Sequence, residues 1–362
     1  MSGQGIPVVH RIGTYQIDLS PGGLDTLRTR LEAVLPGRDF ALITDQNVDL
    51  ASSTWLRGPM AWRERLVTPA GEAFKTRKTW GDLTDRLLEL GFGRETAIIA
   101  LGGGMIGDLA GFVAATYMRG VPFVQIPTSL LAMVDASVGG KVGVDTPRGK
   151  NLVGAFHPPA AVITDPHALE TLPEAQYRAG LAETVKHGLT QDAEYLAWIE
   201  ANAGAILARS PAAVLHLVRR SIELKAAVVQ RDELESGERA ILNAGHTVAH
   251  GLESASGFSL SHGEAVAIGL VAECRLAAKL RLADPGVAER VENILISLGL
   301  PVHPPAGLDR GAATEAIRHD KKNRAGAIRF SLPEAPGRMH RRSGAWTVGV
   351  DPEVVATLMR EM

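Results

Sequence analysis

Residues 96–108 read Thr-Ala-Ile-Ile-Ala-Leu-Gly-Gly-Gly-Met-Ile-Gly-Asp, and this stretch decides the fold class. Its first part is apolar on both faces of an extended chain, which predicts a strand covered on both sides, as in a parallel sheet. The glycines lead into an apolar helical run that starts at Leu109. Because glycine lets a backbone approach a phosphate and the N–H groups of a helix start attract anions, this turn can cradle a phosphate.

The glycine turn formally matches a dinucleotide-binding motif. Gly102, Gly104 and Gly107 satisfy the pattern G-x-G-x-x-G. The acid that should follow about 20 residues later at a strand end is not convincing, because Asp135 comes too late and after another motif. Taken alone, the turn fits a dinucleotide site or a tight turn without a ligand.

The sequence on either side of this stretch indicates two domains. Strand-like runs at 40–44, 63–67 and 122–127 alternate with helical spacing at 79–90, which predicts a parallel sheet with crossover helices. After residue 165 most of the chain has helical period, at 178–189, 211–230, 241–254, 263–280 and 285–298. We therefore expect a Rossmann-like α/β domain over 1–165 and an all-α domain over 166–362. Residues 330–350 are expected to add an irregular or hairpin-like piece.

Composition narrows the class of protein. The chain has 362 residues, 45% of them apolar and 22% charged, which is ordinary for a globular protein of two domains. A formal net charge of −2 argues against a nucleic-acid partner. The single cysteine, Cys274, excludes a disulfide framework and favours the cytoplasm. No apolar stretch suits a membrane helix, and the N-terminus lacks a signal-peptide pattern.

The helical half contains a candidate metal site. Asn243, His246 and His250 have the spacing i, i+3, i+7, so one continuous helix would carry all three on one face. His262 opens the next helical run and is followed by Gly263 and Glu264. Imidazoles from two neighbouring helices can bind a divalent metal, although the spacing alone fits solvated or core histidines equally well. A carboxylate ligand from elsewhere would complete a catalytic site, which usually has three protein ligands.

Residues 116–157 are rich in small hydroxyl side chains, glycine and lysine. This composition predicts that much of the region is loop. Lys141 and Lys150 each lie beside a glycine, where a chain can bend around an anion, so we favour an anion site over incidental solvated lysines.

Many short motifs occur in one order along the chain. They are Gly71-Glu72-x-x-Lys75, the turn at 102–112, Met118-Arg119-Gly120, the run at 127–141, Gly149-Lys150-Asn151-Leu152, Gly180-Leu181-Ala182-Glu183-x-x-Lys186, the acidic stretch at 232–239, Asn243-x-Gly245-His246-Thr247-x-x-His250, His262-Gly263-Glu264 and Asp320-Lys321-Lys322. With this set the sequence closely resembles the 3-dehydroquinate synthase family, from about residue 45 to residue 324.

The resemblance implies an activity and its cofactors. The family converts 3-deoxy-D-arabino-heptulosonate 7-phosphate into 3-dehydroquinate and phosphate in the shikimate pathway. It uses NAD and a divalent metal, usually Zn²⁺ or Co²⁺. A hydroxyl at C5 is oxidised, phosphate leaves by β-elimination, the hydride returns, and the opened ring closes by an intramolecular aldol step. The resemblance also implies a homodimer.

The resemblance further implies a role for each matching residue. The metal ligands would be Glu183, His246 and His262, so His250 would instead meet the substrate or relay a proton. The residues that would contact NAD are Asp45, Asn47, Glu72, Lys75, Gly104, Met105, Ile106, Gly107, Asp108, Thr128, Ser129, Asp135, Lys141, Lys150, Leu169, Glu170 and Thr171. The substrate phosphate would be held by Lys141, Asn151 and one of Lys321 and Lys322, with Arg119 from a partner subunit. The carboxylate would be held by Lys225, Arg239 and Asn243, and the C4 hydroxyl by Lys186 and Asp135.

Three positions depart from the family pattern. Ser129 stands where a second threonine is usual and keeps the hydroxyl. Glu170 stands where lysine is common, which puts one contact to NAD in doubt. Asp145 stands where asparagine is frequent.

Three other functions fit parts of the same pattern. Sister sugar phosphate cyclases, which make 2-epi-5-epi-valiolone or 2-deoxy-scyllo-inosose, take substrates without a carboxylate, and Arg239, Asn243 and His250 fit a carboxylated substrate better. A metal-dependent polyol dehydrogenase would release NADH at each turnover. A non-catalytic anion-binding protein would not need the three ligand candidates together with the full set of lysines and arginines.

Overall fold

The computed structural model describes residues 5–11, 13–53, 56, 62–147, 149–319 and 327–362. The chain divides into two compact units, Met1–Pro173 (unit 1) and Glu174–Met362 (unit 2). The division lies beyond the expected boundary at 165 because the next turn is bound to the first unit. Buried Asp165 accepts hydrogen bonds from the backbone N–H groups of Gly22 and Leu24 at 3.1 Å each.

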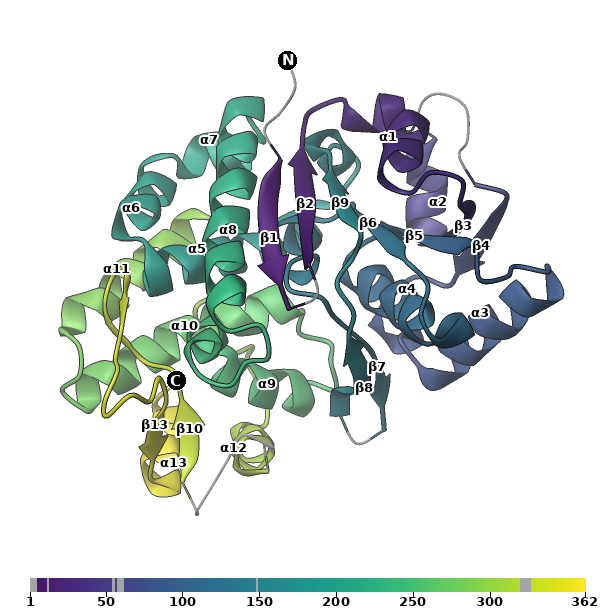
Figure 1. Ribbon diagram of the computed structural model, residues 1–362. Coiled ribbons are helices and arrows are strands. Elements are labelled where there is room, and N and C mark those ends of the chain that lie inside the picture. The colour runs from purple at the N-terminus through teal and green to yellow at the C-terminus, as the bar shows by residue number, and fades with distance from the viewer. Residues whose placement is uncertain (1–4, 12, 54–55, 57–61, 148, 320–326) are drawn as a thin grey trace. The chain divides into compact units, whose positions relative to one another are not determined.

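Unit 1 is built on a seven-stranded sheet with the order β1-β2-β9-β6-β5-β3-β4 (Figure 1). Its strands are β1 (Ile6–His10), β2 (Gly13–Leu19), β3 (Asp39–Asp45), β4 (Glu64–Thr68), β5 (Thr96–Gly102), β6 (Phe123–Pro127) and β9 (Ala161–Thr164). Only the β1–β2 pair is antiparallel among the described pairs of this sheet. The Rossmann-like parallel sheet expected from the sequence is confirmed, and the β1–β2 hairpin is an addition.

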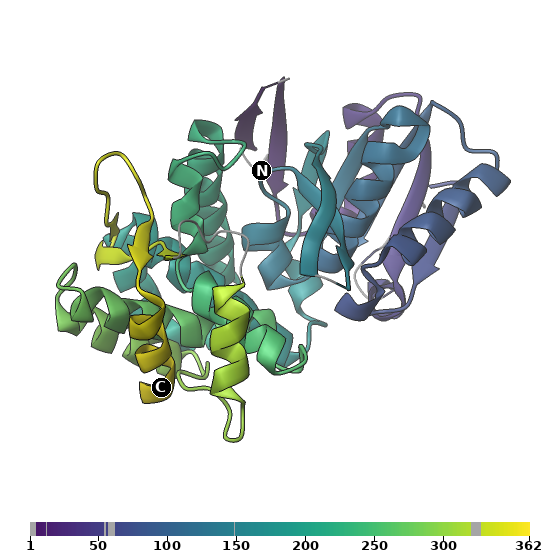
Figure 2. The ribbon, with the colours of Figure 1, turned by 90° about the horizontal axis from the view of Figure 1, so that it is seen from below.

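Helices and short turns connect these strands. They are η1 (Gly23–Thr26), α1 (Leu27–Val34), α2 (Gln46–Ser52), η2 (Glu72–Phe74), α3 (Arg77–Glu89), α4 (Gly104–Thr116), η3 (Tyr117–Arg119), the π-helix η4 (Ala132–Ala136) and η5 (Pro166–Leu169). Apolar residues of α3 and α4, such as Leu87 and Leu109, are fully buried in one cluster with Ile43 and Ile98 of the sheet. In Figure 2 these two helices are the blue ribbons beside the strands of unit 1.

Residues 141–156 form a hairpin, so the loop expected there is wrong for this part. β7 (Lys141–Thr146) and β8 (Gly149–Phe156) pair antiparallel as a separate sheet. Gly143 and Gly154 face each other, and a Cβ on Gly154 would lie 2.3 Å from the Val142 carbonyl oxygen. The two glycines therefore allow close pairing of the two strands, although the glycine-rich composition had suggested a loop.

Unit 2 is largely helical, as expected (Figure 1). Its helices are α5 (Glu174–Gln191), α6 (Ala193–Ala201), α7 (Ala203–Leu207), α8 (Pro211–Arg231), η6 (Glu238–Asn243), α9 (His246–Ala255), α10 (His262–Lys279), α11 (Pro285–Ser297), α12 (Arg310–Arg318) and α13 (Pro352–Glu361). α5 and α10 are buried along nearly their whole length, as expected for helices that are apolar on every face. They form the centre of the unit.

Two details of unit 2 differ from the sequence expectation or complete it. The single helix expected over 241–254 is wrong, because Gly245 adopts φ 80° and separates the 3₁₀ turn η6 from α9. Two small antiparallel pairs join β10 (Ile328–Phe330) to β13 (Val348–Val350) and β11 (Pro333–Ala335) to β12 (Arg338–Met339).

Among the described residues, none of the helices is long and apolar enough to cross a membrane.

Candidate nucleotide turn and metal centre

The glycine turn joins β5 to α4 in the way that the sequence predicts. β5 is buried throughout and ends at Gly102, Gly103 occupies the N-cap position, and α4 begins at Gly104. A Cβ on Gly102 would lie 2.6 Å from the Cβ of Ile106. The pocket beside the turn is lined by small side chains and backbone, including Ala132. A helix start exposed to a pocket of this kind fits a phosphate group.

Most of the expected NAD contacts follow the carboxyl ends of strands of the sheet, whereas Asp135 lies in η4 and Lys141 and Lys150 lie on the β7–β8 hairpin. Asp45 ends β3, Glu72 and Lys75 follow β4, and Asp108 follows β5. Thr128 and Ser129 follow β6, and Leu169, Glu170 and Thr171 follow β9. The carboxyl ends of parallel strands are where open α/β sheets bind their ligands. Asp45 is itself held there, because its carboxylate accepts from the N–H groups of Asn47 and Val48 at the start of α2.

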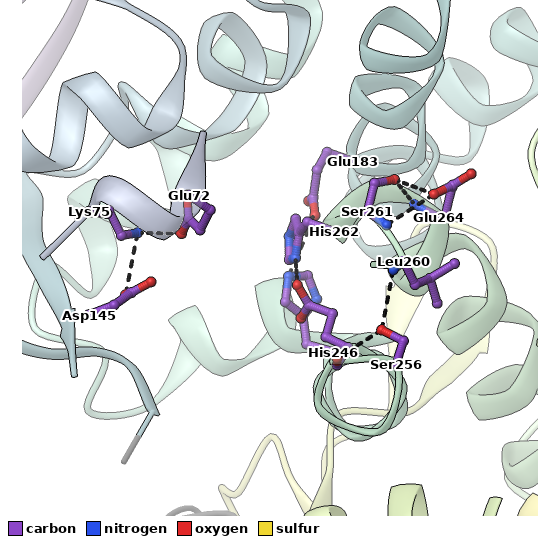
Figure 3. Close-up of polar contacts among 11 residues, drawn as sticks. Glu72, Lys75, Asp145, Glu183, His246, Ser256, Leu260, Ser261, His262 and Glu264 are labelled. Carbon is purple, nitrogen blue, oxygen red and sulfur yellow. Dashed lines mark hydrogen bonds and ion pairs between the residues drawn. The ribbon is translucent and has the colours of Figure 1, made fainter. Parts of the chain in front are cut away.

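The buried Lys75 lies at the centre of an ionic cluster in unit 1 (Figure 3). Its Nζ is 2.9 Å from a Glu72 oxygen, 3.1 Å from Asp108 and 3.7 Å from Asp145. Asp145 also accepts from the N–H of Asn151 at 2.8 Å, and Asn151 has φ 54°. The acid at 145 therefore ties the β7–β8 hairpin to the nucleotide turn through the lysine.

The pKa values of Lys75, Asp108 and Asp145 are all raised. Burial lowers the pKa of Lys75, but the charges of Asp108, Glu72 and Asp145 outweigh that effect and raise it above its ordinary value. Burial raises the pKa of Asp108 to about 6, against the opposing charge of Lys75. Burial likewise raises the pKa of Asp145. The cluster has more carboxylates than cations, and the cost of burying them is only partly offset by Lys75.

Three helices bring the expected metal ligands together in unit 2. Glu183 lies in the middle of α5 and is fully buried, His246 begins α9, and His262 begins α10. One oxygen of Glu183 is 3.5 Å from Nε2 of His246 and 3.5 Å from Nε2 of His262. Figure 3 shows the three side chains pointing toward one another. The ligand atoms of all three lie within 4.8 Å of one another.

This donor set fits a divalent metal. Ligand atoms bound at about 2.0–2.1 Å in a tetrahedral zinc site lie roughly 3.3 Å apart, close to the separations seen here. Nδ1 of His246 donates to the Ala244 carbonyl at 3.1 Å, which leaves Nε2 for a metal. Lys186 contacts the other oxygen of Glu183 and is itself buried. One oxygen of Glu183 is thus paired with a lysine, and the other lies with the two imidazoles in an arrangement that a divalent metal can accept.

The two histidines differ in pKa. Burial lowers the pKa of His246 well below its ordinary value, and the charge of Lys186 lowers it further. Burial also lowers the pKa of His262, but hydrogen bonds to Glu183 and Glu253 outweigh it and raise the value to about 9. One ring is thus held neutral and the other is held between two carboxylates.

The three residues of the His-Gly-Glu motif have different structural roles. His262 supplies the imidazole. Gly263 lets α10 contact α5, because a Cβ there would lie 2.0 Å from the Ala179 carbonyl oxygen. Glu264 completes a capping box with Ser261, whose N–H it accepts at 3.0 Å (Figure 3). The glutamate of the motif therefore stabilises the helix start and does not face the metal ligands.

Two of the three expected carboxylate-binding residues, Arg239 and Asn243, lie on η6, and the loop 232–237 precedes it. Asp232 accepts from the N–H groups of Ser236, Gly237 and Arg239 and so shapes the loop. The buried Arg239 donates to the Glu233 carbonyl at 2.5 Å. Asn243 donates to Glu235 at 2.7 Å, and Glu235 has φ 57°. Glu235 belongs to the Asp-Glu-x-Glu stretch, yet the family resemblance implied no role for it.

The remaining expected residues are placed as follows. His250 follows His246 by one turn of α9, with ring centroids 5.7 Å apart, so these two remain on one helix while Asn243 belongs to η6. Lys225 is buried on α8. Lys141 begins β7 and is exposed. Arg119 lies at the opposite end of α4 from the glycine turn, roughly 20 Å away by the helical rise. Lys321 and Lys322 lie outside the described residues.

Sequence reasoning did not single out two buried acids, Glu253 on α9 and Glu273 on α10. Glu273 is a lone acid within the apolar run 265–274, and an isolated charge in such a run is the signal that could have found it.

Comparison with solved structures first defines the class. The 2-epi-5-epi-valiolone synthase from Streptomyces hygroscopicus subsp. jinggangensis, solved with NAD⁺ and Zn²⁺, matches with a TM-score of 0.85 and 28% identity over 99% of both chains. A 2-deoxy-scyllo-inosose synthase, solved with carbaglucose-6-phosphate, NAD⁺ and Co²⁺, matches in fold with a TM-score of 0.90 and 24% identity over 99% of this chain and all of that one. The fold is that of the sugar phosphate cyclases.

The family models then identify the particular family. The 3-dehydroquinate synthase N-terminal model matches residues 65–179 and the C-terminal model matches residues 180–323. The 3-dehydroquinate synthase of a Synechococcus species is 45% identical over 343 residues, which cover 92% of this chain and 93% of that protein. The chain belongs to the 3-dehydroquinate synthase family, whose members depend on NAD and a divalent metal.

Proposed function

We propose that this protein is an enzyme that converts 3-deoxy-D-arabino-heptulosonate 7-phosphate into 3-dehydroquinate and phosphate. The observation that carries the proposal is the convergence of Glu183, His246 and His262 in unit 2 of a chain that also has a glycine turn at a parallel sheet. Membership of the family supplies the substrate class. Unit 1 would bind NAD, and unit 2 would bind the metal and most of the substrate.

When bound, NAD and the divalent metal would supply a reversible hydride acceptor and a Lewis acid for one substrate hydroxyl. Glu183, His246 and His262 would hold the metal as Zn²⁺ or Co²⁺, both of which accept nitrogen and oxygen ligands. The residues at the carboxyl ends of β3, β4, β5, β6 and β9 would hold NAD, with the start of α4 against its pyrophosphate.

The chain's own cations would orient a substrate with two anionic ends. Lys225, Arg239 and Asn243 would bind the carboxylate. In this structure Asn243 donates to Glu235, so the substrate carboxylate would compete with an acid of the loop that precedes η6. Arg239 suits a carboxylate because its guanidinium can donate two parallel hydrogen bonds.

Other residues would bind the phosphate and the hydroxyls. Lys141, Asn151 and Lys321 would hold the phosphate, and Asp135 and Lys186 would hold the C4 hydroxyl. Lys186 is buried against Glu183 and can donate a proton to an oxygen atom beside the metal. His250, next to His246 on α9, would relay protons. Holding a flexible sugar in one conformation is the main task, so each contact acts through proximity.

The decisive experiment measures phosphate release from the heptulosonate phosphate with and without a chelator. We expect release that stops on metal removal and returns with Zn²⁺ or Co²⁺, without free NADH at 340 nm in excess of the enzyme. Stoichiometric build-up of NADH would instead indicate a polyol dehydrogenase. Cyclisation of sedoheptulose 7-phosphate in preference to the carboxylated substrate would indicate a sister cyclase.

Substitution of Arg239 should affect a carboxylated substrate more than an analogue without the carboxylate. Arg239→Ala should reduce kcat/KM for the heptulosonate phosphate by about 30–150-fold, because a charged hydrogen-bonded contact contributes about 2–3 kcal/mol. A carboxylate-free analogue should lose much less. Equal losses on both substrates would remove Arg239 from carboxylate binding.

We also propose a homodimer in which Arg119 acts on the partner's site. Arg119 is exposed, and it follows Met118 in a turn where both residues have positive φ, a strained conformation that functional positions often show. The outer strand β8 exposes Leu152 and Phe156, which a second copy would cover. Mixing Arg119→Ala chains with Lys141→Ala chains should yield more activity than either preparation alone. Strict additivity after subunit exchange would contradict the contact.

A cytoplasmic location completes the proposal. It is supported by the single cysteine, Cys274, which is buried and unable to form an intrachain disulfide. Fractionation of cells that express the tagged protein would test it.

A further inference from the structure

Glu253 and Glu273 are buried carboxylates that the proposed reaction does not use. Their exposed fractions are 2% and 1%. Burial of a carboxylate is costly unless strong donors surround it, so each of these acids should have a specific partner. The partners of both acids lie at the candidate metal ligands or beside them in the chain.

Glu273 caps a helix to which it does not belong. It lies on α10, yet its oxygens accept from the N–H of Gly245 at 2.7 Å, of Thr247 at 3.0 Å and of Val248 at 3.2 Å, all at the start of α9. The N-cap residue of α9 is Gly245, which has no side chain that could bond these groups. Because α9 begins at His246, the carboxylate of Glu273 sets the position of that ligand.

Close packing explains how Glu273 reaches those groups. Gly269 lies one helical turn before it on α10, and a Cβ on Gly269 would lie 2.0 Å from the Gly245 carbonyl oxygen. Gly245 is also packed closely against α10, since a Cβ there would lie 2.9 Å from the Leu270 side chain. The two glycines bring the helices into backbone contact at this point.

Glu253 makes the converse contact. It lies on α9, and its carboxylate oxygen is 3.5 Å from Nδ1 of His262, the first residue of α10. Nε2 of the same ring faces Glu183. A carboxylate on the far nitrogen of a ligand histidine fixes the orientation of the ring and increases its basicity toward the metal.

We propose that Glu253 and Glu273 form a reciprocal carboxylate clamp between α9 and α10, in which each helix fixes the metal ligand of the other. Both acids are positioning residues. The clamp sets how far apart the two Nε2 atoms lie, and so it sets metal affinity. This inference rests on the proposed metal site.

The experiment uses Co²⁺ as the metal probe on the full chain. The variants are Glu273→Gln, which loses one acceptor oxygen at the helix start, and Glu253→Met, which removes the acceptor for His262 at similar size. Glu253→Gln is the conservative variant, because its carbonyl oxygen still accepts from Nδ1. Asp192→Asn is the matched control, since Asp192 caps α6 in the same unit through the N–H groups of Glu194 and Tyr195.

Three quantities are measured for each variant: the melting temperature of the metal-free protein, the Co²⁺ dissociation constant and the visible absorption spectrum of bound Co²⁺. We expect Glu273→Gln and Glu253→Met to bind Co²⁺ about 10–100-fold more weakly, with an altered spectrum. Glu253→Gln should remain within a few-fold of the parent. The control should lower the melting temperature and leave affinity and spectrum unchanged.

Unchanged affinity and spectrum in both variants, with only the melting temperature reduced, would overturn the clamp. If Glu273→Gln fails to fold, Glu253→Met decides the question because it leaves the cap of α9 intact. Failure of the metal site itself gives a different result, in which the parent binds no Co²⁺ or Glu183→Gln binds it as tightly as the parent.

Discussion

Unit 1 and unit 2 each contain a cluster of ionisable side chains around one buried residue, and the two clusters differ in which residue that is. In unit 1 the ammonium of Lys75 lies among three carboxylates, at 2.9–3.7 Å. In unit 2 a carboxylate and two imidazoles converge, and Lys186 contacts the oxygen of Glu183 that faces away from both imidazoles. The first cluster is centred on a lysine, whereas the second is centred on a carboxylate that contacts Lys186 through one oxygen and lies near two imidazoles through the other, a donor set that fits a metal ion.

The difference predicts which cluster depends on a ligand. The ion pairs of Lys75 link η2, α4 and the β7–β8 hairpin, so we expect that cluster to keep its arrangement without a bound ligand. The cluster around Glu183 fits a metal as a further partner, because one carboxylate oxygen contacts Lys186 and the other lies 3.5 Å from both imidazoles. Metal removal should therefore affect unit 2 and leave unit 1 unchanged.

The largest expected effect follows from Glu183→Gln. The substitution removes the only carboxylate among the three ligand candidates, so we expect metal content to fall below a tenth of the parent's and phosphate release to fall by about 1,000-fold or more. Metal analysis and the phosphate assay measure both. Glu174→Gln is the control, since Glu174 lies on the same helix α5 but is half exposed and paired with Arg178. A fully active, metal-loaded Glu183→Gln protein would show that Glu183 is not a metal ligand, and the proposed difference between the two clusters would then be wrong.

A second prediction tests the packing that brings the ligands together. Gly269→Ala places a methyl group 2.0 Å from the Gly245 carbonyl oxygen, so α9 and α10 must separate. We expect a loss of about 3 kcal/mol or more in the free energy of unfolding of unit 2, together with weaker metal binding. Gly204→Ala is the control, because a Cβ there meets no atom within 4 Å. Denaturant unfolding of the metal-free protein measures the effect, and equal stability of both variants would show that the contact is dispensable.

The nucleotide turn could be predicted from the sequence, because its features are local. Thr96 to Asp108 contain the strand, the glycines and the helix start in one stretch, and the structure has all three there. The hairpin at 141–156 could not be predicted in the same way, because Gly143 and Gly154 matter only once they face each other across two strands.

The candidate metal centre could be predicted only through the family resemblance. Glu183 is far in sequence from His246 and His262, and helical spacing suggested Asn243 and His250 as their companions instead. Gly245, with φ 80°, interrupts the helix that was expected there. α9 therefore starts at His246, and Asn243 does not lie on the same helix. The reach of Glu273 to the start of α9 likewise depends on backbone contact between two helices, which no periodicity reveals.

The smallest predicted effect concerns the pH dependence of unit 1 and tests whether burial or pairing dominates around Lys75. Burial raises the pKa of Asp108 from 3.8 to about 6, so between these values the folded chain binds more protons than the unfolded chain. The contribution of Asp108 to stability is therefore complete below pH 4 and is lost as the pH rises through about 6. In metal-free and NAD-free protein, the melting temperature of the parent minus that of Asp108→Asn should decrease from pH 4 to pH 7, by an amount corresponding to roughly 2 kcal/mol. Asp82→Asn, an exposed acid of α3 that pairs with Lys78, should show no such trend. A difference that increases with pH would mean that the ion pair with Lys75 outweighs burial, and the cluster of unit 1 would then stabilise the fold as an ordinary salt bridge does.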